Sequence, residues 1–207
     1  MKEQRRAPGK KYAAVILIAL CLCGLLAAVL LLPKETAGST GAPTLTVETP
    51  DRISRSGSQE LVLDVTISSL GDTPYPAASA SIAFDPSRLE FLGVEEGNVF
   101  VRDASNGAGQ KLPEWSCSAV QSNKTGMINV IYLDLTGGDH AFSQDLLAAE
   151  DNVLLRLRFR LRGSARVGDV YDLTVEDAVF AASNETQSLS MAQETLQIRN
   201  GRIVIGE

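Results

Sequence analysis

The sequence contains few of the residues that form disulfides, metal sites and nucleophilic active sites. Its 207 residues include three cysteines and one histidine. Two cysteines lie in an apolar N-terminal run, so Cys117 has no partner for a disulfide in the rest of the chain. The Cys and His spacing of a zinc site is absent, and no nucleophile motif accompanies His140 in its Gly-Gly-Asp loop. We therefore expect no enzyme activity, no metal and no cofactor, with Cys117 a buried inert thiol and His140 exposed to solvent.

Aromatic residues are also scarce, and so is positive charge after the first few residues. Aromatics make up 5% of the chain, and the formal net charge is −6. Residues 1–11 carry five Lys or Arg and one Glu, so the remaining residues carry a net charge of −10. Such an acidic chain is poorly suited to nucleic acid, whose affinity comes from Lys and Arg that neutralise phosphates. The acidic residues at 169–172 and 176–177 lack the ligand spacing of a calcium loop, which favours solvated carboxylates.

One long apolar run is present near the N-terminus. Residues 12–32 contain no charged side chain and follow Lys10 and Lys11. A helix over this run, rising about 1.5 Å per residue, spans roughly 30 Å, which matches the hydrocarbon core of a bilayer. The run predicts a single-pass transmembrane anchor in the cell membrane, with residues 1–11 as a basic cytoplasmic segment. A cleaved signal peptide is the alternative, although its apolar region is usually shorter, about 7–15 residues.

The rest of the chain divides into a linker and a domain. Residues 33–43 are rich in Pro, Gly, Ser and Thr and predict a flexible linker. Residues 44–207 alternate apolar and polar side chains, as half-buried strands do. Strand-like runs lie at 61–68, 81–84, 89–94, 127–135, 153–161 and 171–180, and 115–120 is a candidate for another short strand. The run at 127–135 is apolar on both faces, which predicts a central strand. We therefore predict an all-β, extracytoplasmic domain built as an antiparallel β-sandwich of about nine strands.

Two turns in this domain have clear signals. Asp85-Pro86 interrupts an alternating run, because proline donates no hydrogen bond and restricts the residue before it, so we expect the chain to change direction there. Asn200-Gly201 lies between two short apolar runs and predicts a closing hairpin. With no disulfide available, the domain must be stabilised by core packing.

The sharpest charge pattern is a ladder of arginines in the strand predicted at 153–161. Apolar side chains alternate there with Arg156, Arg158 and Arg160. We interpret the ladder as the solvent face of the strand, paired across the sheet with Asp64, Glu60 or Glu90. The alternative is a basic stripe for an acidic partner.

Five segments in order resemble those of cohesin domains. They are FDPSRLEFLGVEEGNVF, GMINVIYLDLTGG, DNVLLRLRFRLRG, YDLTVEDAVF and NGRIVIG, and the resemblance covers residues 44–207. The resemblance implies a nine-stranded jelly-roll sandwich that is non-catalytic and binds dockerin modules, usually to assemble cellulosome-type enzyme complexes. It also implies that the arginine ladder lies on the sheet opposite the binding face.

The resemblance further implies where a partner would bind. The family's dockerin face corresponds to strands at 77–84, 115–120, 127–135 and 171–180. Ile131, Asp134 and Gly137 match an apolar contact, an acidic acceptor and a loop glycine of that face. Ala77 and Ser79 occupy the positions where the family has a polar Asn/Asp pair. The partner-binding residues predicted for this chain are therefore Ala77, Ser79, Ile131, Asp134 and Gly137, with a dockerin-like protein as the partner.

Two other non-catalytic functions fit the same sandwich. A carbohydrate-binding module at the cell surface would bind polysaccharide through a flat strip of exposed aromatic side chains. The sequence has one tryptophan and four tyrosines, and we expect Trp115 to pack in the core or a loop. A structural module of a cell-envelope complex is the third possibility.

Overall fold

The structure is a computed structural model that describes residues 41–50, 52–54, 60–104, 109–137, 139–163 and 165–207, without the side chains of 184–186. The predicted membrane anchor at 12–32 and most of the predicted linker at 33–43 lie outside these residues. Within the described ranges, no helix has both the length and the apolar character needed to cross a membrane.

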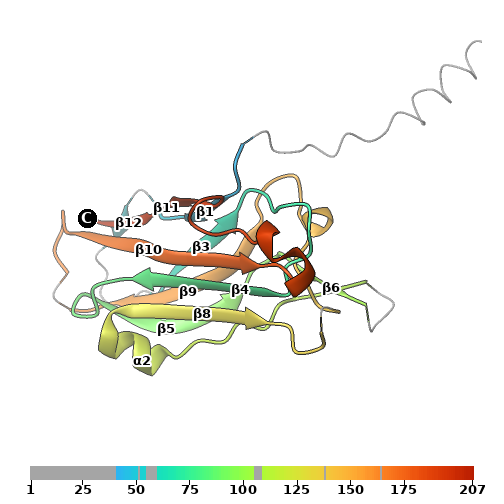
Figure 1. Ribbon diagram of the computed structural model, residues 1–207. Helices are drawn as coiled ribbons and strands as arrows, with labels where there is room; N and C mark the ends of the chain where they lie inside the picture. The colour runs from blue at the N-terminus through green and yellow to red at the C-terminus, as the bar shows by residue number, and fades with distance from the viewer. Residues whose placement is uncertain (1–40, 51, 55–59, 105–108, 138, 164) are drawn as a thin grey trace, which may run out of the picture. The chain divides into compact units, whose positions relative to one another are not determined.

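The described residues form two five-stranded sheets, which confirms the predicted all-β sandwich (Figure 1). The first sheet has the order β11-β1-β3-β9-β5 and the second sheet the order β2-β12-β10-β4-β8. The first comprises β11 (Gln197–Arg199), β1 (Thr44–Val47), β3 (Glu60–Ile67), β9 (Val153–Leu161) and β5 (Leu89–Glu96). The second comprises β2 (Ile53–Ser54), β12 (Gly201–Gly206), β10 (Val170–Ala181), β4 (Ala77–Ala83) and β8 (Met127–Leu133).

Shorter elements complete the domain. β6 (Val101–Asp103) and β7 (Gly109–Lys111) form a separate two-stranded ribbon. The described part of the chain also has one α-helix, α2 (Ala119–Thr125), and the 3-10 turns η1 (Gln144–Leu146) and η2 (Asn184–Leu189). The twelve strands exceed the nine expected because several are only two or three residues long. The sheets are also not purely antiparallel, since β1 pairs with β11 and β2 pairs with β12 in parallel.

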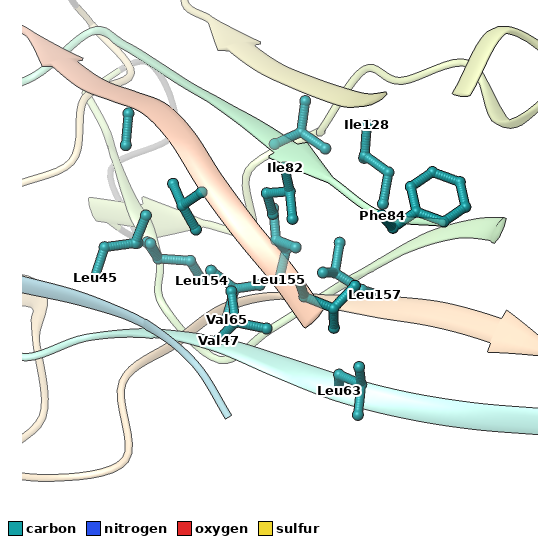
Figure 2. Close-up of a cluster of buried hydrophobic side chains, with 14 of the residues drawn as sticks. Leu45, Val47, Leu63, Val65, Ile82, Phe84, Ile128, Leu154, Leu155 and Leu157 are labelled. Atoms are coloured by element: carbon teal, nitrogen blue, oxygen red, sulfur yellow. The ribbon is translucent and has the colours of Figure 1, made fainter. Parts of the chain in front are cut away.

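The core is the apolar layer between the two sheets. Leu63 and Leu157 of the first sheet point towards Ile82 and Ile128 of the second (Figure 2). Three phenylalanines, Phe84, Phe91 and Phe159, cluster at one end with ring centroids 5.4–6.3 Å apart. Each fully buried side chain of this kind contributes about 1.5–3 kcal/mol to folding. The apolar layer between the sheets therefore stabilises the domain without a disulfide.

The Asp85-Pro86 corner carries the chain from the second sheet to the first, as the sequence predicts. It joins β4 to β5, which lie in different sheets. The Asp85 carboxylate accepts hydrogen bonds from the Ser87 hydroxyl at 2.6 Å and the Ser87 amide at 2.8 Å. These two hydrogen bonds lower the pKa of Asp85, so the corner is held by an ionised side chain at neutral pH.

The prediction of a short strand at 115–120 is wrong. Only Ser116 pairs with another strand, in a single bridge to Ile131 of β8. Ser118 then caps α2 by accepting from the Gln121 amide at 3.3 Å, and Gly126 ends the helix at φ +71°. The helix has a structural use, because the Asn123 side chain hydrogen-bonds both the N–H and the C=O of Phe91 at the free edge of β5.

The closing hairpin predicted around Asn200-Gly201 is also wrong. The segments on either side of Asn200 lie in different sheets, with β11 beside β1 and β12 beside β10. The Asn200 side-chain oxygen accepts from the Val175 amide at 2.9 Å, where β10 has a bulge. Asn200 therefore holds a crossover between sheets instead of a hairpin turn.

The arginine ladder is paired across the first sheet, which confirms the structural interpretation. β9 lies between β3 and β5, so acidic side chains flank the arginines on both sides. The pairs are Arg156 with Asp64 at 3.2 Å, Arg158 with Glu60 and with Glu95 at 3.3 Å, and Arg160 with Glu90 at 3.4 Å. The Arg158 hydrogen bond lowers the pKa of Glu60. The outer face of this sheet is thus covered by charges that neutralise one another.

Replacing Phe159 tests how far stability depends on the core. Phe159 is fully buried and contacts both other phenylalanines, so Phe159→Ala should lower the free energy of unfolding by about 3–5 kcal/mol. Val62→Ala on neighbouring β3 is the control, because Val62 is 49% exposed and its truncation should cost less than about 0.5 kcal/mol. Urea unfolding followed by Trp115 fluorescence measures both. Equal losses in the two variants would contradict this account of the core.

Candidate binding face

The outward side of β10, β4 and β8 carries three of the five predicted partner-binding residues. In the strand register, Ser79 lies between Val179 and Ile131, and Ala77 lies between Ala181 and Leu133. Directly opposed residues project to the same side of a sheet, and the alternate residues of these strands are buried in the core. We call this surface the outer face of the second sheet, defined by Ala77, Ser79, Ser81, Asn129, Ile131, Leu133, Asp177, Val179 and Ala181.

One end of this outer face is apolar and well exposed. Ile131 is 51% exposed and Leu133 is 59% exposed, and Leu135, just beyond β8, is 87% exposed. β4 contributes only the small side chains of Ala77 and Ser79 beside them, so nothing on β4 shields the two larger residues. Contiguous exposed apolar patches are typical of surfaces that contact other molecules, so this end is the candidate binding region.

The other end of the outer face is polar. Ser81 lies between Asp177 and Asn129, and its hydroxyl donates to the Asn129 side-chain oxygen at 2.8 Å. The face therefore divides into an apolar part near the C-terminal end of β8 and a hydrogen-bonding, acidic part near its start.

A shallow groove of about 510 Å³ runs along the free edge of β8, next to the apolar end. At one point on this edge, the Ser116 backbone pairs with the Ile131 backbone through two hydrogen bonds of 2.8 and 3.0 Å. The groove is lined by Lys111, Glu114, Ser116, Ile131, Tyr132, Leu133, Asp134, Leu135, Thr136 and His140. It joins the outer face of the second sheet to the turn that follows β8.

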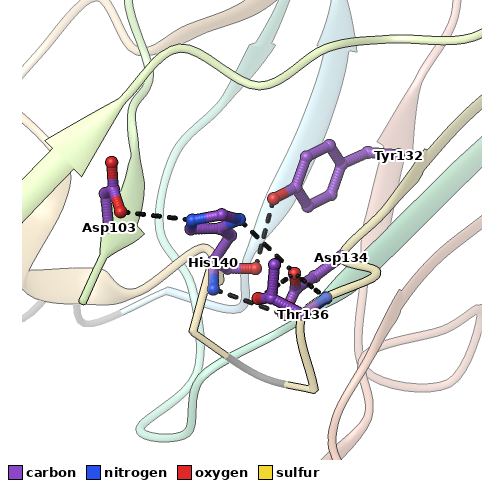
Figure 3. Close-up of polar contacts among 5 residues, drawn as sticks. All are labelled: Asp103, Tyr132, Asp134, Thr136 and His140. Atoms are coloured by element: carbon purple, nitrogen blue, oxygen red, sulfur yellow. Dashed lines mark hydrogen bonds and ion pairs between the residues drawn. The ribbon is translucent and has the colours of Figure 1, made fainter. Parts of the chain in front are cut away.

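Asp134 and Gly137 shape this turn, and the structure does not bring Asp134 onto the outer face with Ile131. The Asp134 side chain is fully buried, and its contacts with Thr136 and His140 are drawn in Figure 3. Its Oδ1 accepts from the amide and the hydroxyl of Thr136 at 2.8 and 2.6 Å, and its Oδ2 accepts from the His140 amide at 3.3 Å. Gly137 adopts φ +91°, a left-handed conformation that side chains with a Cβ disfavour.

His140 is not the exposed loop residue that the sequence predicted. Its side chain is 13% exposed, and its Nε2 lies 3.2 Å from Oδ1 of Asp103. Its Nδ1 lies 3.5 Å from Oδ1 of Asp134, and its carbonyl oxygen accepts from the Tyr132 hydroxyl at 3.1 Å. Burial raises the pKa of Tyr132 to about 12, and the negative charges of Asp134 and Glu114 add to this effect. The Tyr132 hydroxyl therefore stays protonated. Asp103 was missed because it is 37 positions from His140 and no local motif links them.

Neither Cys117 nor Trp115 offers a second site. Cys117 is half-buried, and burial raises the pKa of its thiol, which agrees with an inert role. Trp115 is also half-buried, stacks on Phe142 at 5.8 Å and donates its indole N–H to the Leu154 carbonyl at 3.1 Å. Among the residues that the structure describes, no group of three or more His, Cys, Asp or Glu side chains is arranged to hold a metal ion.

Comparisons with known proteins point to one family. A family model described as "Cohesin domain" matches residues 44–198. No curated protein sequence matches.

Solved structures share the fold at low sequence identity. The third cohesin of ScaC from Acetivibrio cellulolyticus, solved with the ScaB dockerin, is 15% identical with a TM-score of 0.56, covering 80% of this chain and 99% of its own. An OlpA cohesin of Clostridium thermocellum, also solved with a dockerin, is 15% identical with a TM-score of 0.55, covering 80% and 99%. A non-cellulosomal cohesin of the archaeon Archaeoglobus fulgidus is 13% identical with a TM-score of 0.53, covering 81% and 93%.

Substitution of Gly137 tests the geometry of the turn after β8. Nothing lies within 4 Å of a Cβ placed there, so Gly137→Ala should destabilise the chain only through its positive φ, by about 1–2 kcal/mol. Gly163→Ala is the matched control, because that position also has open space and lacks the positive φ. Thermal unfolding of both variants measures the difference. An unchanged midpoint for Gly137→Ala would contradict the left-handed turn.

Proposed function

The chain belongs to the cohesin family, and from that premise we propose that it binds another protein on the outer face of its second sheet. The partner is a dockerin-type module or another surface protein. The observation that carries the proposal is the exposed apolar pair Ile131 and Leu133 beside the small side chains of Ala77 and Ser79. Two similar cohesins were solved with dockerins, which supports a dockerin as the first partner to test.

The face suits docking without rearrangement. All three of its strands are hydrogen-bonded to a neighbour, and β4 is held on both sides by β10 and β8. A partner would therefore meet a preformed surface and lose little conformational entropy in the protein to which it binds. Most of the affinity would come from a few central side chains, for which Ile131 and Leu133 are placed.

The small residues on β4 define which partner fits. A polar pair at these positions would offer hydrogen bonds, whereas Ala77 offers none and Ser79 offers one hydroxyl. We infer that the partner buries apolar side chains against Ile131 and Leu133 and makes its polar contacts near Ser81 and Asn129, where the face is hydrophilic.

Asp134 and Gly137 contribute in a different way from the one that the sequence suggested. The Asp134 oxygens already accept hydrogen bonds within the turn, so a direct contact with a partner has less support than a shaping role. We propose that both residues hold Leu135 and Thr136 at the end of the groove.

We also propose that the domain works outside the cytoplasm, held at the cell membrane by the apolar run at 12–32. The absence of charge in that run and the lysines before it support this placement. The linker at 33–43 would keep the binding domain close to the membrane surface.

A carbohydrate-binding function has less support. It needs aromatic side chains in a flat exposed strip, and none of the residues that define the outer face of the second sheet is aromatic. Trp115, the one tryptophan, packs on Phe142. The same face carries no constellation of catalytic groups, so we propose a non-catalytic module.

Placing a charge at the centre of the apolar end tests the proposal. Ile131→Asp should weaken binding of a dockerin from the same source at least about 30-fold, because a buried unpaired carboxylate would meet the apolar side chains of the partner. Val62→Asp is the matched control, since Val62 is exposed to nearly the same extent on the first sheet. Isothermal titration against each dockerin encoded by the source organism measures the affinities.

The result can also fail in two informative ways. Equal affinity of the Ile131→Asp variant and the native chain would move the interface elsewhere. Binding on a glycan array, with no dockerin or other surface protein recovered from cells, would instead favour the carbohydrate-binding function.

A further inference from the structure

β8 is the last strand of the second sheet, with β4 on one side and, among the described residues, no full strand on the other (Figure 1). The sequence predicted a central strand at 127–135, because this run is apolar on both faces, and that prediction is wrong. Ile131 and Leu133 are more than half exposed as a result. The composition of β8 therefore suits a strand with more neighbours than this chain supplies.

The backbone of β8 alternates in the direction of its hydrogen-bonding groups, so every second residue directs its N–H and C=O away from β4. The Ile131 backbone faces this free edge, because it exchanges two hydrogen bonds with Ser116. The Asp134 amide faces the opposite way and donates to the Pro76 carbonyl, next to β4, at 2.8 Å. By the same alternation, three more residues face the free edge with their backbone groups, namely Met127, Asn129 and Leu133.

The chain itself occupies part of this edge. The Thr125 hydroxyl accepts from the Met127 amide at 3.2 Å and donates to the Met127 carbonyl at 3.4 Å, and Ser116 occupies a second position. Asn129 lies between these two contacts, each about 7 Å away along the strand, so an added strand would be blocked on both sides. Leu133 lies beyond Ser116, and no described residue hydrogen-bonds its outward N–H or C=O.

The unpaired backbone of Leu133 faces the groove along β8. The segment of Ser116 does not continue the pairing, because Glu114 would lie opposite Leu133 in the same register and no hydrogen bond joins their backbones. Lys111, Glu114 and Ser116 line the groove together with residues 131–136. The space of about 510 Å³ thus lies where a strand paired with Leu133 would run.

The edge strand of the first sheet provides a contrast. On β5 the Asn123 side chain hydrogen-bonds both the N–H and the C=O of Phe91, so that part of the edge is covered. Strand edges that are neither covered nor charged pair readily with other chains. Leu133 lacks such a cover, and its neighbours on the same edge, Ile131 and Leu135, are apolar and exposed. This part of β8 is therefore suited to pair with an extended chain.

We propose that the partner adds a short extended segment to β8 at Leu133 and exchanges two backbone hydrogen bonds with that residue. The inference rests on the proposed function, since it gives the same partner a second contact at the edge of the same face. The segment runs antiparallel to β8, as Ser116 does, and fills the groove. Strand addition of this kind gives affinity through the main chain and specificity through alternate side chains.

The groove also defines the side chains of the segment. The residue opposite Leu133 must have an N–H, which excludes proline. Its side chain points to the outer face of the second sheet, because directly opposed residues share a side, and it is apolar there beside Leu133 and Leu135. The residues before and after it point into the groove, where Lys111 and Glu114 suit polar side chains. The partner segment is thus polar, apolar and polar in turn.

Hydrogen exchange of the full chain in detergent micelles tests the pairing directly. Without a partner, the Leu133 amide should exchange at least about tenfold faster than the Ile131 amide, which faces the same edge but donates to Ser116. A dockerin that binds in the titration should slow exchange at Leu133 about tenfold or more, because a donor that faced water gains an acceptor. Unchanged exchange at Leu133 in a saturated complex would overturn the proposal.

A proline at the same position tests the hydrogen bond separately from the side chain. Leu133→Pro removes the N–H, and proline is tolerated where the N–H of an edge strand faces outwards. Its affinity for the dockerin should fall about tenfold or more below that of Leu133→Ala, because a carbonyl of the partner loses its donor. Leu133→Ala is the matched control, since it shortens the side chain and keeps the N–H. Equal affinities of the two variants would contradict strand addition.

Folding of the Leu133→Pro variant is checked by urea unfolding followed by Trp115 fluorescence. If that variant does not fold, exchange at Leu133 in the native chain decides between the outcomes. A second copy of the chain is the competing occupant of the edge. Protection of the Leu133 amide that rises with the concentration of the chain alone, together with dimers in sedimentation, would assign the edge to self-pairing and overturn a partner segment.

Failure of this inference and failure of the proposed function give different results. A dockerin that binds through Ile131 and leaves exchange at Leu133 unchanged would keep the face as the binding site and remove the edge pairing. If no dockerin or other surface protein binds, a displayed library of short random peptides tests the edge alone. Peptides that bind the native chain and not the Leu133→Pro variant would support the edge pairing without the proposed function, and recovery of no such peptide would remove both.

Discussion

The register of β4 against β8 is the constraint on which the rest of the structure depends. Side chains alternate along a strand, so burying Ala78 and Ile82 against the first sheet necessarily directs Ala77 and Ser79 outwards. The same alternation holds for β8. Burial of Val130 directs Ile131 outwards, and Leu133, two residues further along the strand, points to the same side. A slip of one residue would bury the polar set and expose the core. The surface that we propose for binding is thus fixed by the packing that folds the domain.

The two outer faces of the sandwich differ in the side chains that they expose to solvent. On the first sheet, acidic residues of β3 and β5 pair with the arginines of β9, and the surface is self-neutralised. Exposed ion pairs of this kind add little stability, but a charged surface resists apolar contacts. The second sheet has no such cover over Ile131 and Leu133. This asymmetry, more than the fold itself, indicates the side on which a partner can bind.

The sequence predicted the features that depend on local patterns. The sandwich, the corner at Asp85-Pro86 and the ion pairs of the arginine ladder follow from alternation, proline chemistry and charge spacing. The position of Ile131 on an outward face also follows, once the resemblance to cohesins identifies which strands share a sheet. Each of these predictions needs a few neighbouring residues or one cross-strand partner.

The errors arose where distant contacts decide the outcome. The helix after Trp115 has local end signals in Ser118 and Gly126, but its place beside β5 depends on the distant contact of Asn123 with the backbone of Phe91. Asn200 marks a crossover because its side chain meets Val175. The buried position of His140 depends on Asp103, which a short ribbon brings to it from far away in the sequence. The alternation of apolar and polar residues along the sequence does not reveal these contacts between distant residues.

The path of the chain at the start of β1 has a mechanical consequence. The N-terminal connection enters the domain at Thr44 in the first sheet, whereas the proposed contact lies on the second. If the proposed anchor pulls along β1 while a partner is docked, the force would act against the antiparallel ladder of β3 and the parallel ladder of β11. Ladder hydrogen bonds run across the strands, so such a force shears many of them together instead of opening them one by one. Under such a force, the load would pass from β1 to the second sheet through the apolar layer between the two sheets.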